Sequence, residues 1–293
     1  MKETGVPALH LDLGNFAAVR TGTESVRTAF IWDALAVLGV DATTLGPAEL
    51  TQWARVDSLR QARPIPIVAS NLFLQAFVDS ASEPSPPLAH GGDSRASLRP
   101  FVDSASEPSP TLVPVGERSL VVERGGVRVG LIALLDPSAL QALPEDDGHR
   151  WTATDPRSCL LELLPDLRAQ TDLVVLLSQM PTGMTDAILG STTGVDVALY
   201  GLRAPQEDSA GRIGGAVVLR AGAKGQYLGR LTIGLGDAHE IRSVSADTRA
   251  LDESFPKDPQ WTARVARGVA EADSARANYL RRDQEAFDAL FRQ

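Results

Sequence analysis

The sequence predicts an α/β fold in which strands are layered against helices. Short apolar runs recur along the 293-residue chain, stretches with helical periodicity separate several of them, and 43% of the residues are hydrophobic. Runs without polar alternation are typical of strands covered on both faces, and strands that alternate with helices are typical of layered α/β domains. A chain of this length buries a core large enough for one large domain or two modest ones.

The expected strands are apolar runs bounded by glycine, proline or polar residues. In order, they are ALHLDL at 8–13, VDATTL at 40–45, IPIVASN at 65–71, VRVGLIAL at 127–134, DLVVLLS at 172–178 and VDVALYG at 195–201. Helical periodicity predicts helices at 25–39, 50–62 and 156–170. Two later runs, GAVVLRAG at 215–222 and YLGRLTIGLG at 227–236, are expected to form sequential strands, as a hairpin or a sheet edge.

An unusual segment separates the third and fourth expected strands. The ten residues FVDSASEPSP occur at 77–86 and again, identically, at 101–110. Ser, Pro, Glu and Gly bury too little apolar surface to offset the cost of ordering, so 78–110 is predicted to be a mobile surface insert. We interpret the repeat as a local duplication inside a tolerant loop, with a short linear binding motif as the alternative.

The last part of the chain is rich in alanine and charge. Asp258 is a plausible N-cap and Pro259 suits the first helical position, which predicts one or two amphipathic helices. We therefore divide the chain into a domain at 1–245 and a C-terminal helical extension at 246–293. Packing onto the domain is the simplest role for the extension. A lead into another domain and pairing with a partner are alternatives.

Composition excludes several classes of function. A net charge of -9 and a pI near 5.0 argue against binding to nucleic acid or to anionic lipid. No apolar run reaches the ~18 residues of a membrane span, and the N-terminus as written lacks the apolar core of a signal peptide. The single cysteine, Cys159, excludes an internal disulfide, a CxxC redox pair and a CxxCH haem site, and we interpret it as a core residue.

The ends of the expected strands carry a resemblance to a known family. LHLDLGN resembles a family phrase that ends in Gly-Asp, VDATTLGPAEL one that ends in GNHE, DLVVLLSQ one that ends in His, and VDVALYGLRA one that ends in GHxH. IPIVASN, GGVRVGLIAL and RAGAKGQYLGRLTI match three further strands in order. From 8 to 236 the chain resembles the N-terminal domain of 5′-nucleotidases, in the calcineurin-like metallophosphoesterase family. The resemblance implies an α/β, layered metallophosphoesterase-like fold with mixed β-sheets flanked by helices, which lacks the usual first strand and is followed by C-terminal helices.

The resemblance also implies where a metal site would lie. The family hydrolyses phosphate esters with two metal ions, such as Mn²⁺ or Zn²⁺, which need carboxylate and imidazole ligands. The family's bridging aspartate falls on Asn15. Five other ligands fall on Pro47, Ala48, Gln179, Leu202 and Ala204, and the family's opening DxH strand has no counterpart. Together with their polar neighbours, the vestigial site positions are Asp12, Asn15, Pro47, Ala48, Glu49, Gln179, Leu202, Arg203 and Ala204.

Other residues offer little replacement for the missing ligands. The chain has four histidines, none of which shares a ligand spacing with another: His10, His90, His149 and His239. Asp12, Asn15 and Glu49 are weak candidates for a Mg²⁺ or Ca²⁺ contact. Arg203 suits an anion fork, but we interpret it as a surface ion pair.

Two functional hypotheses follow. The leading one is a degenerate metallophosphoesterase-like domain without a resident cofactor, which acts as a binding or structural module. The alternative is an active phosphoesterase with an unusual carboxylate and amide site. The missing first strand predicts an exposed sheet edge, and a protein partner at that edge or at the C-terminal helices is expected. Nucleic acid, haem and a membrane span are not expected. Family members are commonly exported, so the resemblance implies a periplasmic or extracellular full-length form.

Overall fold

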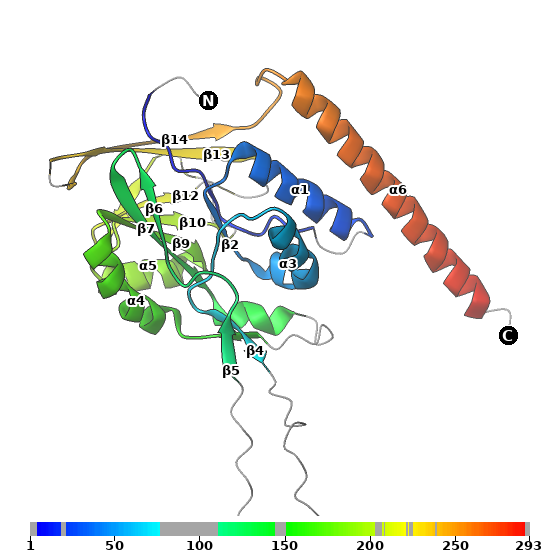
Figure 1. Cartoon of the computed structure of the whole chain (residues 1–293), viewed down its shortest axis with the longest axis horizontal. Helices are drawn as coiled ribbons and strands as arrows, with labels where there is room; N and C mark the ends of the chain where they lie inside the picture. The colour runs from blue at the N-terminus through cyan, green and yellow to red at the C-terminus, as the bar shows by residue number, and fades with distance from the viewer. Residues whose placement is uncertain are drawn as a thin grey trace, which may run out of the picture.

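Four layers of secondary structure, helix, sheet, sheet and helix, build this chain (Figure 1). The computed structural model describes residues 5–18, 22–76, 111–143, 151–202, 207, 209–220, 222, 225–237 and 239–290. The duplicated segment and the insert at 78–110 lie outside the described residues.

A six-stranded mixed sheet forms the centre. Its order is β11-β12-β10-β9-β7-β6, and β12, β10, β9 and β7 are parallel. The strands are β6 (Leu120–Arg124), β7 (Val127–Leu135), β9 (Leu173–Gln179), β10 (Val197–Tyr200), β11 (Gly211–Ile213) and β12 (Ala216–Arg220). Every residue of β9 is buried, as its unbroken apolar run predicts. The carboxyl ends of the parallel strands lie at one edge of this sheet.

Two helices cover one face of the large sheet, α4 (Pro156–Gln170) and α5 (Thr182–Ser191). The Asp155 carboxylate starts α4, because it accepts a hydrogen bond from the Ser158 N–H at 2.8 Å, and Pro156 follows at the first helical position. α4 approaches β7 closely at Gly130, where a Cβ atom would lie 2.6 Å from Cγ of Leu167. A glycine is therefore required for this helix to reach its strand.

A smaller parallel sheet packs on the other face. It consists of β1 (Leu11–Asp12), β2 (Ala42–Thr44) and β3 (Ile67–Val68), in that order. Buried side chains of this sheet, such as Ala42 and Val68, meet Leu131 and Leu177 of the large sheet in one apolar cluster. A long antiparallel hairpin, β13 (Tyr227–Leu235) and β14 (Ile241–Ala250), packs against the same cluster.

The fourth layer lies on the outer face of the small sheet. It contains α1 (Glu24–Leu38), α2 (Pro47–Leu50) and α3 (Trp53–Ala62). Trp32 of α1 is fully buried there beside Val56 of α3. A third sheet, β5 (Thr111–Pro114), β4 (Leu72–Ala76) and β8 (Trp151–Ala153), and a 3-10 helix, η1 (Pro137–Ala142), lie next to this layer.

One sequence expectation needs correction. The runs at 215–222 and 227–236 do not pair with each other: β12 joins the large sheet, and β13 pairs with β14. β14 was not predicted, because its sequence, IRSVSADTRA, is largely polar and only one of its faces is partly covered. The expected domain boundary between 245 and 246 falls inside this strand.

Most of the C-terminal extension is one continuous helix, α6 (Pro259–Leu290). The Asp258 carboxylate accepts hydrogen bonds from the N–H groups of Gln260 at 2.7 Å and Trp261 at 3.2 Å, so the predicted N-cap is confirmed. α6 runs beside α1 (Figure 1). In the described part of the chain, no helix is both long and apolar enough to span a membrane.

Candidate functional site

The strand-end positions meet around a tight turn after β1. Gly14 and Asn15 are consecutive residues with positive φ angles, 74° and 60°. A Cβ atom at Gly14 would lie 2.7 Å from the carbonyl oxygen of Thr44, so glycine is needed for this close approach. Asn tolerates the left-handed region better than most residues. This turn brings Asn15 beside Glu49 of α2 and Gln179 of β9.

Glu49 is the centre of the cluster, and its side chain is fully buried. Its Oε2 atom accepts hydrogen bonds from the N–H groups of Asn15 and Gly46, both at 2.8 Å. Its Oε1 atom accepts a hydrogen bond from the N–H of Ala17 at 2.7 Å. One carboxylate therefore joins the turn after β1 to the N-terminus of α2, where Pro47 occupies the first position.

Two amide side chains link this cluster to the large sheet. Nδ2 of Asn15 donates to Oε1 of Gln179 at 3.3 Å, and Oδ1 of Asn15 accepts from the N–H of Ala48 at 3.3 Å. Nε2 of Gln179 donates to the carbonyl oxygen of Leu13, and Gln179 is fully buried. Asn15 and Gln179 occupy two ligand positions of the resembled family, and both of their amide groups are hydrogen-bonded to other groups of the protein.

Asp12 lies at the end of β1, half-buried and hydrogen-bonded. Its Oδ2 atom accepts from the Thr43 hydroxyl at 2.7 Å and from the Gly14 N–H at 2.9 Å. Burial raises the pKa of Asp12, although both hydrogen bonds act in the opposite direction.

Burial also controls the protonation of Glu49. It raises the pKa of this carboxyl from its ordinary value of 4.5 to about 7. The three backbone N–H donors lower the pKa but do not cancel the effect of burial, and the negative charge of Asp12 raises it further. Near neutral pH, Glu49 therefore exchanges between its ionised and neutral forms.

The donor set does not fit the two-metal centre that the resemblance implies. Both oxygens of Glu49 already accept backbone hydrogen bonds, and the Asn15 and Gln179 amides bond to each other. Among the residues that the structure describes, no three His, Cys, Asp or Glu side chains are grouped so that they could hold a metal ion. Leu202 is half-buried and apolar, and Arg203 and Ala204 lie outside the described residues.

The two histidines that the structure describes, His10 and His239, lie away from this cluster. His10 is exposed just before β1. His239 lies in the turn between β13 and β14, where its Nδ1 atom is 2.8 Å from Oδ1 of Asp172. His90 and His149 lie outside the described part of the chain.

Sequence reasoning missed a second polar group at the strand ends, on the α5 side. The Tyr200 hydroxyl donates to Oδ1 of Asp186 at 2.5 Å, and the Arg220 guanidinium lies 4.5 Å from the centre of the Tyr200 ring. Nη1 of Arg220 donates to both oxygens of Glu207, at 2.9 and 2.8 Å. The available signal was an arginine that ends the otherwise apolar strand β12. This network ties α5 and residue 207 to the sheet.

Asn71, at the end of the third expected strand, hydrogen-bonds to two other segments of the chain. Nδ2 of Asn71 donates to the carbonyl oxygens of Leu135 and Thr154, both at 2.9 Å, and Oδ1 accepts from the Leu135 N–H at 2.9 Å. Asn71 is fully buried. Its side chain therefore holds the end of β7 against the chain that leads out of β8.

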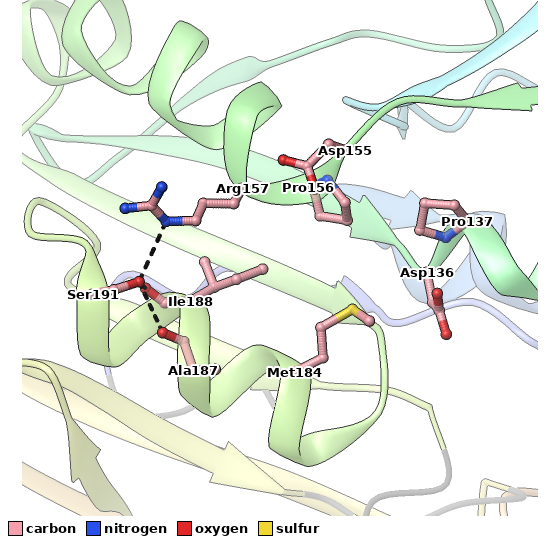
Figure 2. A pocket seen from close by; sticks show the side chains of 9 residues that line it. All are labelled: Asp136, Pro137, Asp155, Pro156, Arg157, Met184, Ala187, Ile188 and Ser191. Carbon is pink, nitrogen blue, oxygen red and sulfur yellow. Dashed lines mark hydrogen bonds between the residues drawn. The ribbon is translucent and has the colours of Figure 1, made fainter.

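An open hollow of about 490 Å³ lies between the start of α4 and α5 (Figure 2). Met184 and Ile188 line it, and Nε of Arg157 donates to the Ser191 hydroxyl at 3.4 Å. The carboxylate of Asp136 at its rim accepts from the Ser138 N–H at 2.9 Å, which caps η1. Asp155 caps α4 in the same way. The acidic groups of this hollow are thus already used to start helices.

The architecture is shared with solved structures. The sequence matches no protein-family model and no curated protein sequence at a significant level. Its structure is similar to the sulfate thiohydrolase SoxB of Thermus thermophilus, with a TM-score of 0.68 and 21% identity, over 90% of this chain and 42% of that one. It is similar to a 5′-nucleotidase precursor of Thermus thermophilus, with a TM-score of 0.70 and 17% identity, over 94% and 51% of the two chains.

A third structure covers nearly the same length. The calcineurin-like phosphoesterase YfkN of Bacillus subtilis is similar with a TM-score of 0.64 and 15% identity, over 93% of this chain and 85% of that one. This chain spans about half the length of the first two structures. These similarities confirm the sequence resemblance at the level of fold, and identities this low say nothing of activity. The chain therefore has the metallophosphoesterase fold of these 5′-nucleotidase and calcineurin-like structures.

Proposed function

We propose that this chain is a binding or structural module on a metallophosphoesterase scaffold, without a resident metal and without phosphoesterase activity. The observation that carries this proposal is the hydrogen bonding of Glu49. Its carboxylate connects the turn after β1 to α2 through three backbone N–H groups. In the resembled family, metal ligands occupy the neighbouring positions, which here are Asn15, Pro47 and Ala48.

The Asn15 and Gln179 amides support the same proposal. Metal ligands must present free lone pairs to a common point. Here the amide oxygens of Asn15 and Gln179 accept hydrogen bonds from the protein, at 3.3 Å each. To bind a metal, the cluster would have to break hydrogen bonds of the buried side chains of Glu49 and Gln179, which is costly.

One observation favours an active enzyme as the second candidate. Asp12 and Glu49 are two carboxyl groups with raised pKa values at the strand ends. Perturbed carboxyl groups are common in active sites. This candidate is a metal-dependent phosphoesterase with Mn²⁺ or Zn²⁺ held by Asp12, Asn15 and Glu49.

A metal titration separates the two candidates. The purified chain is titrated with Mn²⁺ and Zn²⁺ while its melting temperature and its hydrolysis of p-nitrophenyl phosphate are followed together. An ion present at a hundred times its Kd would stabilise the fold by ~2.7 kcal/mol, a readily measured shift in Tm. We expect neither a shift nor turnover.

The control is the Glu49→Gln variant, treated in parallel. Metal-dependent turnover that Glu49→Gln abolishes would overturn the proposal and favour the enzyme. Turnover that is equal in both proteins would come from a contaminating phosphatase, and the proposal would stand.

The proposed module needs a surface for its partner. β1 is an end strand of the small sheet, and among the described residues only β2 pairs with it. Unpaired strand edges attract other strands. We therefore include a protein partner at the free side of β1 or at α6 in the proposal, and neither nucleic acid nor a membrane.

A further inference from the structure

Two contacts between α6 and the domain lie far apart along the helix. Gly268 lies against Phe30 of α1, where a Cβ atom on the glycine would be 2.5 Å from Cδ2 of the ring. Farther along α6, the ring of Tyr279 lies on Gly22, just before α1, where a Cβ atom would be 2.6 Å from Cγ of the tyrosine. α6 runs beside α1 (Figure 1), and about 16 Å of helix separates the two contacts.

The docking of α6 on α1 involves little buried apolar surface. No described residue of α6 belongs to any of the three apolar clusters. An ion pair joins Arg264 of α6 to Asp33 of α1 at 4.0 Å, and Asp33 is shared with Arg63 of the domain, at 3.1 Å. Ion pairs between exposed groups contribute little to stability. Elements held by few buried contacts open locally, so α6 separates from the domain at low cost.

The Tyr279 contact lies where α1 begins. The N–H of Gly22, under the tyrosine ring, donates to Oε1 of Glu24 at 2.9 Å, and Glu24 is the first residue of α1. Thr28 lies one turn further along, on the same face of the helix as Glu24. The contact with Tyr279 therefore fixes the chain at the first turn of α1.

The same part of α1 holds the segment that leaves the Glu49 cluster. The buried hydroxyl of Thr28 accepts from the N–H of Ala18 at 3.2 Å and donates to Oε1 of Gln52 at 3.0 Å. Nε2 of Gln52 donates to the carbonyl oxygen of Ala18. The preceding residue, Ala17, donates its N–H to Glu49 at 2.7 Å. Described residues thus form a continuous line of contacts from α6 to Glu49.

We propose that α6 is a detachable clamp on the Glu49 cluster. While α6 is docked, Tyr279 holds the first turn of α1, and Thr28 holds the segment that carries Ala17. When α6 separates from α1, the hydrogen bond from Ala17 to Glu49 opens more often. Coupling between two sites is reciprocal. A molecule that binds α6 only in its separated position therefore loosens the cluster, and a molecule that loosens the cluster promotes the separation of α6.

The clamp does not depend on the proposed function, because it concerns how α6 and the cluster influence each other and not what the cluster binds. It operates whether or not a metal ion enters the cluster. The metal titration and the measurement of the clamp therefore have separate outcomes.

Amide hydrogen exchange of the full chain, followed by NMR, tests the clamp. Tyr279→Ala removes the ring from Gly22, and we expect the amide of Ala17 to exchange at least about fivefold faster, the lower end of typical couplings between sites. The amide of Leu176, inside the fully buried strand β9, should keep its rate. Tyr279→Phe keeps the ring atoms that touch Gly22, so it should behave as the parent chain.

Gly268→Leu tests whether α6 acts as one rigid unit. The added side chain has no room beside Phe30, so it pushes α6 away from α1 and leaves Tyr279 itself unchanged. We expect the amide of Ala17 to accelerate at least about fivefold here too, although the substitution is remote from Gly22.

Leu280→Ala is the matched control, since it truncates the residue next to Tyr279, whose side chain is 55% exposed. It should leave the exchange of Ala17 unchanged. Circular dichroism verifies that each variant keeps its helix content. Any of four results would overturn the proposal: an unchanged Ala17 rate in Tyr279→Ala or in Gly268→Leu, an equal acceleration at Leu176, a Tyr279→Phe effect as large as that of Tyr279→Ala, or the same effect in Leu280→Ala.

Discussion

Glu49 shows how much a single buried carboxyl can shape a site. Its oxygens accept three backbone hydrogen bonds, and these fix the turn after β1 against α2. The same burial raises its pKa to about 7. The group that organises the cluster is therefore also a group whose charged form burial disfavours at neutral pH.

The raised pKa predicts a pH dependence of stability. The folded chain binds a proton at Glu49 more tightly than the unfolded chain, whose pKa is near 4.5. The stabilisation is therefore complete below pH 4.5 and is lost as the pH rises to about 7. At ~1.4 kcal/mol per pKa unit, this group alone lowers the free energy of unfolding by about 3 kcal/mol across that window.

Urea unfolding at a series of pH values measures this loss. In the Glu49→Gln variant, the free energy of unfolding should change less between about pH 5 and 7 than in the parent chain. The raised pKa of Asp12 also makes stability fall as the pH rises, so part of the pH dependence remains in the variant. Glu162→Gln, at an exposed carboxyl whose pKa its ion pair with Arg118 lowers, should keep the slope of the parent chain. An unchanged slope in Glu49→Gln would show that this carboxyl is ionised in the folded protein at lower pH than burial implies.

At this scale, the sequence predicts where the site lies better than what it does. The strand-end phrases placed Asp12, Asn15, Glu49 and Gln179 at one edge of the sheets, and the structure brings them together. The hydrogen bonds that close the cluster come largely from backbone N–H groups, such as that of Ala17. Residue types carry no signal for such donors, because every non-proline residue has one.

At the scale of elements, close contacts between helices and strands decide which residues are permitted. Gly130 allows α4 to reach β7, and the side chain of Leu167 fills the space above it. This contact explains why a strand so rich in Val, Leu and Ile includes a glycine in its interior.

Two Gly→Ala substitutions should therefore have opposite effects. Gly130→Ala places a methyl group 2.6 Å from Leu167, and we expect it to lower the free energy of unfolding by ~1–3 kcal/mol. Gly190→Ala, near the end of α5, meets nothing within 4 Å and should leave stability unchanged or raise it by up to ~1 kcal/mol. Thermal unfolding of both variants checks the pair. Equal changes in stability for the two variants would mean that α4 can shift away from β7 at no cost to accommodate the added methyl group.

Elements with strong local signals were predicted well, and those without were not. The bounds of α4 agree with the prediction, because Asp155 and Pro156 mark its start. α5 was missed because its sequence, TGMTDAILGS, is poor in strong helix formers, and burial of Ile188 and Leu189 forms it instead. β14 was also missed, because its largely polar sequence carries no strand pattern and pairing with β13 forms the strand instead.

At the scale of the whole molecule, the four layers and the long helix contribute unequally to stability. The three apolar clusters hold the layers together, and none includes a described residue of α6. The order of the strands along the chain could be predicted because the segments that resemble the family follow one another in the family's order. The arrangement of two sheets face to face could not be predicted from the residues themselves, because contacts between distant segments leave no periodicity in the sequence.

Removal of the last turns of α6, residues 280–290, tests this division. A chain that ends at Tyr279 should unfold with a free energy within ~0.5 kcal/mol of the parent. Leu72→Ala is the contrasting control, since this side chain is fully buried and its loss should cost ~2–5 kcal/mol. A large loss on truncation would show that the last turns of α6 support the domain.

The continuity of α6 also fixes a direction in space. Each residue of an α-helix advances the chain by ~1.5 Å and turns it by ~100°, so the tip of α6 has a defined azimuth relative to the layers. The helix therefore fixes both the distance of its last side chains from the layers and the direction in which they point. Two added residues would turn it by about 200°, whereas seven would return it to within ~20° of its original heading, farther out but facing the same way.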